Sequence, residues 1–317
     1  MTHDAVQGAA SVTPGRRLDA RPGVWLAEVA LVLMSVIWGA NFSVMKYGTT
    51  VIPPLGYNAV RIALAAVMLL VIAMLLAGPA PSRRDALAIF ALGAFGNGVY
   101  QIIWVEGLSM TRAGEAALVV GASPALMALV GRLRGVELVT ARGVAGIVLS
   151  ILGVTLIVLG RATSGAAAPG GSLAGDLLVL GAAVCWAIYT VWLLPYTRRV
   201  SGWWVTALSI AGGAVVLLFV GTPDILRIAW RSVPQNLWAA ILYGSIGSMV
   251  VAYFFWYYGV RKLGPTRTAL FGNLQPFVAL LVAWMALGEV PTLWQGIGAV
   301  TIVSGVLLTR ARSAEVS

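Results

Sequence analysis

The sequence predicts an all-α polytopic membrane protein with ten transmembrane helices, arranged as two inverted five-helix repeats with both termini in the cytoplasm. Three observations lead to this prediction: the composition, the placement of the basic residues and an internal repeat. Of the 317 residues, 60% are hydrophobic and 10% are charged, and the mean hydropathy is +0.91. Soluble domains carry about 25% charged residues. A surface so poor in charge is typical of a protein that lies in a lipid bilayer.

Ten apolar runs divide the chain, and each approaches the roughly 20 residues that one membrane crossing needs. Two runs are less regular, because 113–133 contains Glu115 and Pro124 and because 203–220 is short. The runs cover residues 25–47, 56–77, 86–107, 113–133, 141–160, 174–195, 203–220, 237–259, 266–286 and 293–309.

Basic residues are distributed unequally between the two sides that these runs define. If the N-terminus is cytoplasmic, fifteen of the 21 lysines and arginines lie in cytoplasmic segments and five lie on the other side, while Arg61 falls within the second run. Cytoplasmic segments collect Lys and Arg, so we expect cytoplasmic termini and a bacterial-type cytoplasmic (inner) membrane. A missed helix would blur this bias, which therefore also supports the count of ten. The net charge of +10 is scattered between apolar runs and does not indicate nucleic-acid binding.

An internal repeat relates the two halves of the chain. A shift of 152 residues aligns 104–156 with 256–308 without a gap, and fourteen of the 53 positions are identical. A second copy of a five-helix unit enters the membrane in the opposite orientation, and such inverted repeats are typical of secondary transporters with a substrate site near the midplane. Pairs that apolar composition alone would not place in register are Trp104/Trp256, Pro124/Pro276, Glu137/Glu289, Thr140/Thr292 and, at a shift of 148, Trp38/Trp186.

The repeat and a linker rich in Gly, Ala, Ser and Pro set the predicted domain organisation. We expect a cytoplasmic N-terminal tail over 1–24, a first five-helix repeat over 25–160, a periplasmic linker over 161–173, a second repeat over 174–310 and a C-terminal tail over 311–317.

Aromatic and amide side chains recur on single faces of several runs, at depths where polar groups are costly unless they face protein or water. These side chains could line a central cavity for a flat, amphipathic solute, or they could pack helices together. Aromatic faces also attract organic cations. The predicted substrate-binding residues are Trp38, Asn41 and Phe42 in the first run, Asn97, Tyr100 and Gln101 in the third, Trp186 and Tyr189 in the sixth, Tyr253 in the eighth, and Phe271, Asn273 and Gln275 in the ninth.

Arg61 lies about a turn and a half inside the second run, and an ionisable residue at that depth is a candidate functional residue. Its guanidinium could pair with a substrate carboxylate. Alternatively, it could extend to the outer headgroups or bond to carbonyl groups at the ends of neighbouring helices.

Two repeated pairs are interpreted as structural features. Pro124 and Pro276 each remove a backbone hydrogen bond within a run, which predicts kinks that act as hinges between the halves. Glu137 and Glu289 each precede a run, and we expect each carboxylate to favour the start of the helix that follows it.

Several function classes are not supported by the residues present. The chain has one cysteine, Cys185, and one histidine, His3, so we expect no metal site, no cofactor and no nucleophile–base pair of an intramembrane enzyme. No P-loop for ATP is present.

The mode of coupling is a separate question. No acidic residue lies at mid-run, which weakens the case for proton antiport and leaves facilitated transport or exchange equally open. A non-transporting scaffold would need no inverted repeat, and a monomer is compatible with these features.

The repeated patterns resemble the EamA family of the drug/metabolite transporter superfamily, and most closely the YddG-type exporters of aromatic amino acids. The resemblance covers about residues 25–310 and implies ten helices, cytoplasmic termini and export of small metabolites. Aromatic amino acids are the leading substrates that it implies, and amphipathic cations or drugs such as methyl viologen are the alternative. The residues that carry it are Pro124…Glu137-x-x-Thr140…Gly146…Gly153, its repeat Pro276…Glu289-x-x-Thr292…Gly298…Gly305, the segment Trp38-Gly39-Ala40-Asn41-Phe42, and Arg61.

Overall fold

The computed structural model describes residues 24–136, 140–163, 171–263, 268 and 271–310. The predicted N-terminal tail up to residue 23, the C-terminal tail 311–317 and linker residues 164–170 lie outside the described residues, as does Glu137. The described residues form helices joined by short connections and contain no strand.

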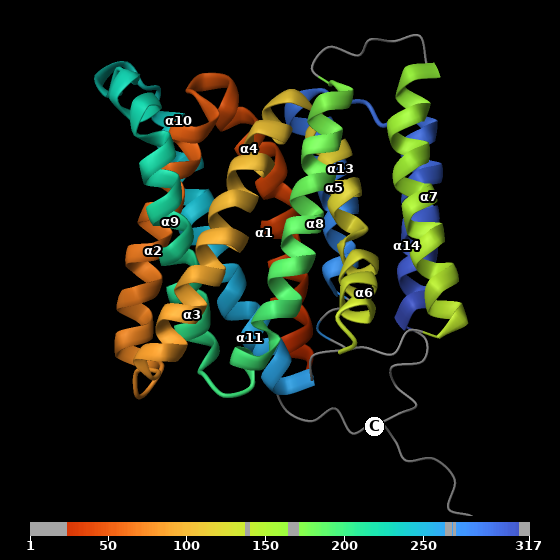
Figure 1. The fold of residues 1–317 in the computed structure, drawn as a ribbon. Helices are drawn as coiled ribbons and strands as arrows, with labels where there is room; N and C mark the ends of the chain where they lie inside the picture. The colour runs from red at the N-terminus through yellow and green to blue at the C-terminus, as the bar shows by residue number, and fades with distance from the viewer. Residues whose placement is uncertain (1–23, 137–139, 164–170, 264–267, 269–270, 311–317) are drawn as a thin grey trace, which may run out of the picture.

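Long helices stand side by side and run between the same two faces of the molecule (Figure 1). Along the chain they are α1 (Val24–Val51), α2 (Pro54–Leu76), α3 (Arg83–Gly93), η1 (Ala94–Val99), α4 (Tyr100–Met110), α5 (Ala113–Gly121), α6 (Ser123–Leu133), α7 (Ala141–Thr163), α8 (Leu173–Thr197), α9 (Gly202–Arg227), η2 (Trp230–Ser232), α10 (Gln235–Leu242), η3 (Tyr243–Val251), α11 (Ala252–Leu263), η4 (Gly272–Leu274), α13 (Gln275–Leu287) and α14 (Leu293–Arg310).

Within the described residues, eight helical stretches are long and apolar enough to cross a membrane, so the chain is a multi-pass membrane protein. These stretches match the first eight predicted runs, and two shorter apolar helices over Gly272–Leu287 and Leu293–Leu308 match the ninth and tenth. The run expected to be short, 203–220, is longer than predicted, because α9 continues through Pro223 to Arg227 and has 26 residues.

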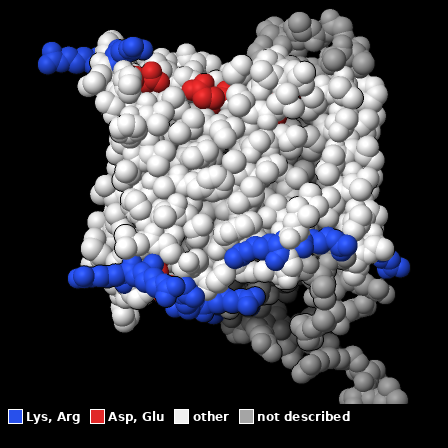
Figure 2. Space-filling view, viewed as in Figure 1, with Lys and Arg blue, Asp and Glu red and all other residues white. Residues whose placement is uncertain are grey.

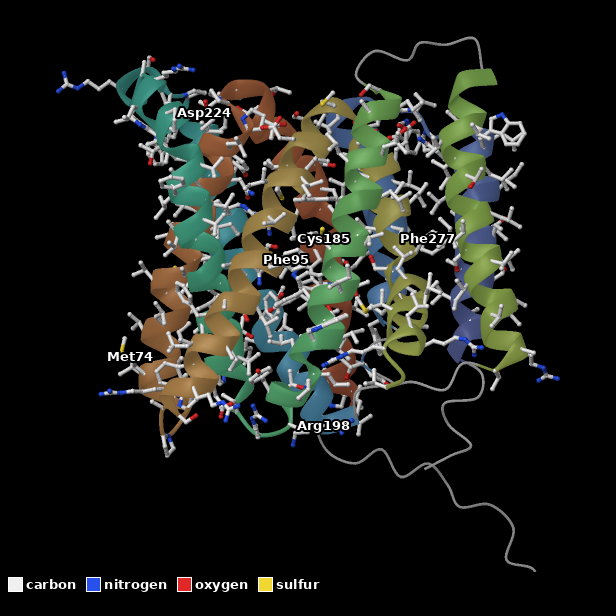
Figure 3. The ribbon with its side chains drawn as sticks, viewed as in Figure 1. Met74, Phe95, Cys185, Arg198, Asp224 and Phe277 are labelled. Carbon is white, nitrogen blue, oxygen red and sulfur yellow. The ribbon has the colours of Figure 1, made fainter. Side chains whose placement is uncertain are left out.

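Charged side chains mark the two ends of the bundle. Figure 2 shows Lys and Arg in a belt around one end of the visible face, whereas most acidic side chains gather at the opposite end. Arg198 and Met74 lie at the end that carries the belt, Asp224 lies at the other end, and Cys185 of α8 lies about midway between them (Figure 3). Side chains adjacent to Cys185 in α8 are therefore far from both ends.

Two π-helical segments interrupt long helices at positions that the repeat relates. Segment η1 covers residues 94–99 and leads into α4 at Tyr100, while η3 covers residues 243–251 and leads into α11 at Ala252. The two junctions are 152 residues apart, which is the shift of the sequence repeat. A π-helical turn widens the backbone and leaves carbonyl groups free for other partners, and such turns are frequent at functional sites.

Pro124 and Pro276, the two prolines that the repeat relates, stand at helix starts rather than within helices. The run 113–133 consists of two helices, α5 and α6, separated at Ala122, and Pro124 lies in the first turn of α6. Pro276 likewise lies in the first turn of α13, after the short η4. The predicted loss of a backbone bond at mid-helix is thus wrong, because first-turn N–H groups have no partner within the helix. Both runs are nevertheless interrupted at matching positions.

Helices α7 and α14 pack closely through glycines that the repeat relates. A Cβ atom placed on Gly153 would lie 2.9 Å from the carbonyl oxygen of Gly298, and one placed on Gly298 would lie 2.8 Å from that of Gly153. Gly305 approaches Gly146 in the same way. In the repeat, Gly153 corresponds to Gly305 and Gly298 corresponds to Gly146. The repeat therefore converts each contact into the other, as at an interface between two copies related by a two-fold axis. The residue order shows that the two helices run antiparallel.

Candidate functional site

A first aromatic cluster, called here the Trp38 group, joins α1 to α11. The Trp38 ring lies 5.5 Å from that of Tyr253, edge to face, and 6.0 Å from that of Trp256. Its indole nitrogen donates to the carbonyl oxygen of Ser248 at 2.9 Å, within η3. The π-helical segment thus provides a backbone acceptor that fixes the orientation of the indole ring.

A second cluster, the Trp186 group, joins α8 to α4 and α1. The Trp186 ring lies 5.3 Å from that of Tyr100 and 5.2 Å from that of Tyr189. Tyr100 stacks with Trp104 at 6.3 Å, and Phe42 of α1 meets Trp104 edge to face at 5.3 Å. Offset and edge-to-face pairs at these distances are favourable aromatic contacts.

The two groups correspond under the repeat. Trp38 corresponds to Trp186, and Trp256 corresponds to Trp104. Each group therefore combines a helix from one half of the chain with a helix from the other half. Helix α1 belongs to both, because Trp38 lies in the first group and Phe42, one turn later, lies in the second.

Arg61 forms a buried polar network with Asn58 and Gln101. The guanidinium donates to Asn58 Oδ1 at 2.8 and 3.2 Å, to Gln101 Oε1 at 3.3 Å and to the carbonyl oxygen of Gly244 in η3 at 3.3 Å. Asn58 Nδ2 donates in turn to Gln101 at 3.1 and 3.2 Å. The exposed fraction of Arg61 is 1%. The interpretation that Arg61 extends to the headgroups is thus wrong, and the neighbours that it bonds are mainly side-chain amides.

Asn41 lies beside this network, on α1 between the two aromatic groups. Its Oδ1 atom is buried and has no hydrogen-bond partner among the described residues. A Cβ atom placed on Gly244 would lie 2.5 Å from Arg61 Cδ and 3.6 Å from Asn41 Oδ1. Asn41 and Arg61 therefore face the same point of η3, where only glycine leaves room for both.

The remaining predicted residues lie in three other places. Asn97 is buried in η1 against Gly213 of α9, and Phe271 packs with Trp38 against the same buried apolar side chains. Gln275 lies at the start of α13, where its carbonyl faces Gly39 of α1, and Asn273 lies in η4. No described contact links Asn97, Asn273 or Gln275 to the ring–ring pairs of either aromatic group.

Comparison with known proteins identifies the family. The model of the EamA-like transporter family matches residues 25–159 and 173–311. The chain belongs to the EamA-like transporter family. Its relatives include an uncharacterized transporter, YyaM, of Bacillus subtilis, 29% identical over 88% of this chain and 92% of that protein. Another is a protein of Streptantibioticus cattleyicolor named as a probable terminal-alkyne amino-acid exporter, 28% identical over 90% of this chain and 93% of that protein.

A solved crystal structure shares the fold of this EamA protein. The TM-score is 0.62 at 21% sequence identity, and the match covers 92% of this chain and 99% of the other. Family membership and the names of the relatives point to a transporter rather than to an enzyme.

The EamA chain also carries a cluster of charged side chains that its sequence did not reveal. The Glu289 carboxylate accepts hydrogen bonds from the N–H groups of Ala113 and Gly114, at 3.0 and 3.1 Å, at the start of α5. Arg112 lies 4.0 Å from both Glu289 and Glu115, and donates to the carbonyl oxygen of Val290 at 2.9 Å. The Glu289 carboxylate thus stabilises the start of α5, which belongs to the other half of the chain. The prediction assigns it to the start of the helix that follows it.

Buried acceptors extend this cluster across the halves. Gln295 Nε2 donates to Glu115 Oε1 at 3.2 Å, and the Thr111 hydroxyl contacts both Glu115 and Asp176. Asp176 lies in the first turn of α8. The cluster therefore fastens α5 to α8, α13 and α14 at the end of the bundle where α4 ends.

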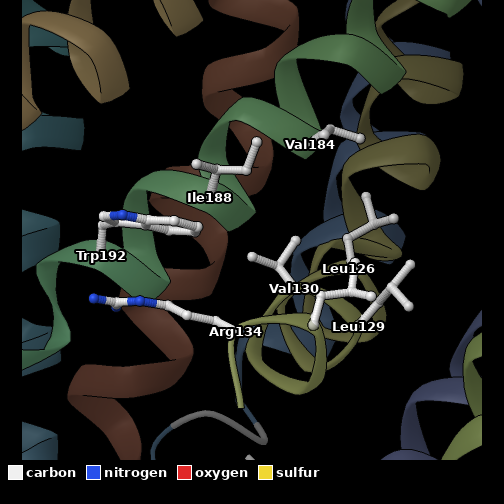
Figure 4. A pocket seen from close by; sticks show the side chains of 8 residues that line it. Leu126, Leu129, Val130, Arg134, Val184, Ile188 and Trp192 are labelled. Atoms are coloured by element: carbon white, nitrogen blue, oxygen red, sulfur yellow. The ribbon is translucent and has the colours of Figure 1, made fainter. Parts of the chain in front are cut away.

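A shallow crevice of about 530 Å³ opens between α6 and α8 (Figure 4). Its lining is almost wholly apolar, and the exception is Arg134, whose guanidinium lies 4.6 Å from the centre of the Trp192 ring and donates to the carbonyl oxygen of Val191 at 2.7 Å. None of the predicted substrate-binding residues lines it. Its side chains suit contact with lipid, so it is not the candidate site.

Proposed function

We propose that this EamA protein is a secondary transporter that exports small amphipathic metabolites, with aromatic amino acids as its leading substrates. The observation that carries the proposal is the pair of aromatic groups, each of which joins the two halves of the chain. Trp186 follows Cys185, which lies about midway between the ends of the bundle (Figure 3), and this position supports a transport site near the midplane.

The proposal includes ten spans, two inverted five-helix repeats and cytoplasmic termini in an inner membrane. Three observations support it: the family model matches two segments of similar length, the π-helical segments correspond, and the α7–α14 contacts are reciprocal. An axis that relates two antiparallel spanning helices lies in the plane of the membrane, which is the symmetry of inverted repeats. Exchange of conformations between such halves gives alternating access.

The chemistry of the two aromatic groups supports the substrate class. Indole and phenol rings offer faces and edges on which a substrate ring can stack. Such faces would also accept amphipathic cations such as methyl viologen, which is the second candidate substrate. The relative named as a probable amino-acid exporter makes amino acids the first compounds to test.

Uptake into liposomes that contain only the purified protein tests the proposal. Labelled phenylalanine, tryptophan, alanine and methyl viologen are each offered with and without a pH gradient. We expect uptake of phenylalanine and tryptophan above that of protein-free liposomes, and little uptake of alanine. Folded protein that transports none of the four would overturn the proposed substrates, and preferential uptake of methyl viologen would establish the second candidate.

A further inference from the structure

Arg61 is a buried cation without a carboxylate partner among the described residues. All four of its hydrogen bonds go to neutral oxygen atoms of Asn58, Gln101 and Gly244. Arginine stays protonated in proteins, and a buried charge is costly unless an opposite charge compensates it. Neutral acceptors orient the guanidinium but leave its charge uncompensated, so the site is complementary to an anion.

The hydrogen bonds of Arg61 do not use all of its donors. A guanidinium has five N–H groups, and the four hydrogen bonds employ Nε, both N–H groups of Nη2 and one of the two on Nη1. One N–H of Nη1 therefore remains for a further acceptor. It belongs to the same nitrogen that donates to the carbonyl oxygen of Gly244, the residue that Asn41 also faces.

Asn41 contributes the opposite kind of group at the same place. Its buried Oδ1 is an acceptor without a partner among the described residues, and an unsatisfied buried acceptor costs free energy unless a donor reaches it. A protonated amine is a strong donor to a carbonyl oxygen. A donor for an anion and an acceptor for a cation thus lie side by side at Gly244.

We propose that Arg61 and Asn41 form a headgroup site for α-amino acids, in which Arg61 binds the carboxylate and Asn41 Oδ1 accepts from the ammonium group. This inference rests on the proposed transport function and specifies its substrate class. Asn41 adjoins Phe42 of the Trp186 group, and Gln101 adjoins Tyr100, so a bound amino acid can place its side chain among the rings. A bipyridinium cation such as methyl viologen meets the Arg61 charge at this site and is disfavoured.

Competition by analogues of phenylalanine tests the headgroup site in the unaltered protein. Uptake of labelled phenylalanine into liposomes is measured against unlabelled phenylalanine, phenethylamine, which lacks the carboxylate, and 3-phenylpropionate, which lacks the ammonium group. We expect each analogue to compete at least about ten-fold less well than phenylalanine, because each loses a charge-assisted hydrogen bond. Equal competition by phenethylamine would overturn the headgroup site and leave the proposed transport function standing.

Two variants assign the discrimination to the named residues. Arg61→Gln should remove the advantage of phenylalanine over phenethylamine, and Asn41→Leu should remove its advantage over 3-phenylpropionate. Arg134→Gln, which removes an exposed arginine at the α6–α8 crevice, should leave both preferences unchanged. If Arg61→Gln folds and keeps the preference for the carboxylate, the assignment to Arg61 is wrong. Unaltered protein that transports no amino acid overturns the proposed function and the headgroup site together.

Discussion

At the scale of single residues, the two basic side chains of the first two helices have different surroundings. Lys46 Nζ donates to the carbonyl oxygens of Leu108 and Ser109, at 3.0 and 2.8 Å, in the last turn of α4. The negative end of a helix dipole favours a cation there, so Lys46 fastens α1 to α4. Arg61 has only amide oxygens and one π-helical carbonyl as hydrogen-bond partners among the described residues, which supports the proposal that its charge binds a substrate carboxylate.

Removal of a central indole should weaken transport more than removal of an indole on the surface. Trp186→Ala deletes the ring between Tyr100 and Tyr189, whereas Trp284 is 52% exposed on α13. An aromatic pair contributes about 0.5–1.5 kcal/mol beyond area burial. We therefore expect the KM for phenylalanine to rise about 2- to 12-fold in Trp186→Ala. Trp284→Ala should leave it unchanged, and equal effects in the liposome assay would show that Trp186 only packs helices.

At the scale of helices, hydropathy and the 152-residue repeat were sufficient to predict where each helical run lies. They could not predict the π-helical segments or the division of the run 113–133 at Ala122, because a local change of hydrogen-bond pattern leaves no trace in hydropathy. They also could not predict the partners of Arg61, because Gln101 and Gly244 lie 40 and 183 residues away along the chain. Helical spacing predicts most rings of the two aromatic groups and the repeat pairs Trp104 with Trp256, but the contacts of these rings across the halves depend on how the helices pack.

The reciprocal glycine contacts should make α7 and α14 intolerant of a single added methyl group. A Cβ atom on Gly153 would lie 2.9 Å from the Gly298 carbonyl oxygen, whereas one on Gly296 meets nothing within 4 Å. Overpacking typically costs about 1–3 kcal/mol. We expect Gly153→Ala to lower the melting temperature of the detergent-solubilised protein by several degrees, and Gly296→Ala to leave it nearly unchanged or raise it. The opposite ranking would contradict the close packing of this helix pair.

At the scale of the whole molecule, contacts between the halves differ in kind along the bundle. Aromatic rings of both halves meet in the Trp186 group, beside Cys185 about midway along the bundle, while the charged cluster around Glu289 and Arg112 joins the halves at the end where α4 meets α5. Apolar side chains can slide past one another with little change in free energy. The ion pairs and hydrogen bonds at the start of α5, in contrast, are either formed or broken. An alternating-access cycle would thus break the charged cluster while the aromatic groups rearrange around the solute.

The orientation of the bundle can be tested with cysteines on its exposed connections. Ser82, before α3, and Ser232, in η2, are both exposed. In a Cys185→Ala background we expect a membrane-impermeant maleimide to label Ser232→Cys in intact cells and Ser82→Cys only after the cells are opened. Labelling of both in intact cells, or of Ser82→Cys alone, would contradict cytoplasmic termini.

Protection of a single cysteine by a transported solute tests most directly whether the pathway runs between the halves. Thr190 lies one turn from Trp186 on α8, where its hydroxyl donates to the Trp186 carbonyl oxygen at 2.8 Å, and Val215 of α9 is 57% exposed on the outside of the bundle. In a Cys185→Ala background, the rate at which a small thiol reagent modifies each cysteine is measured with and without saturating phenylalanine. We expect phenylalanine to slow modification of Thr190→Cys several-fold and to leave Val215→Cys unaffected. Modification of Thr190→Cys at an unchanged rate, in protein that transports phenylalanine, would place the pathway elsewhere.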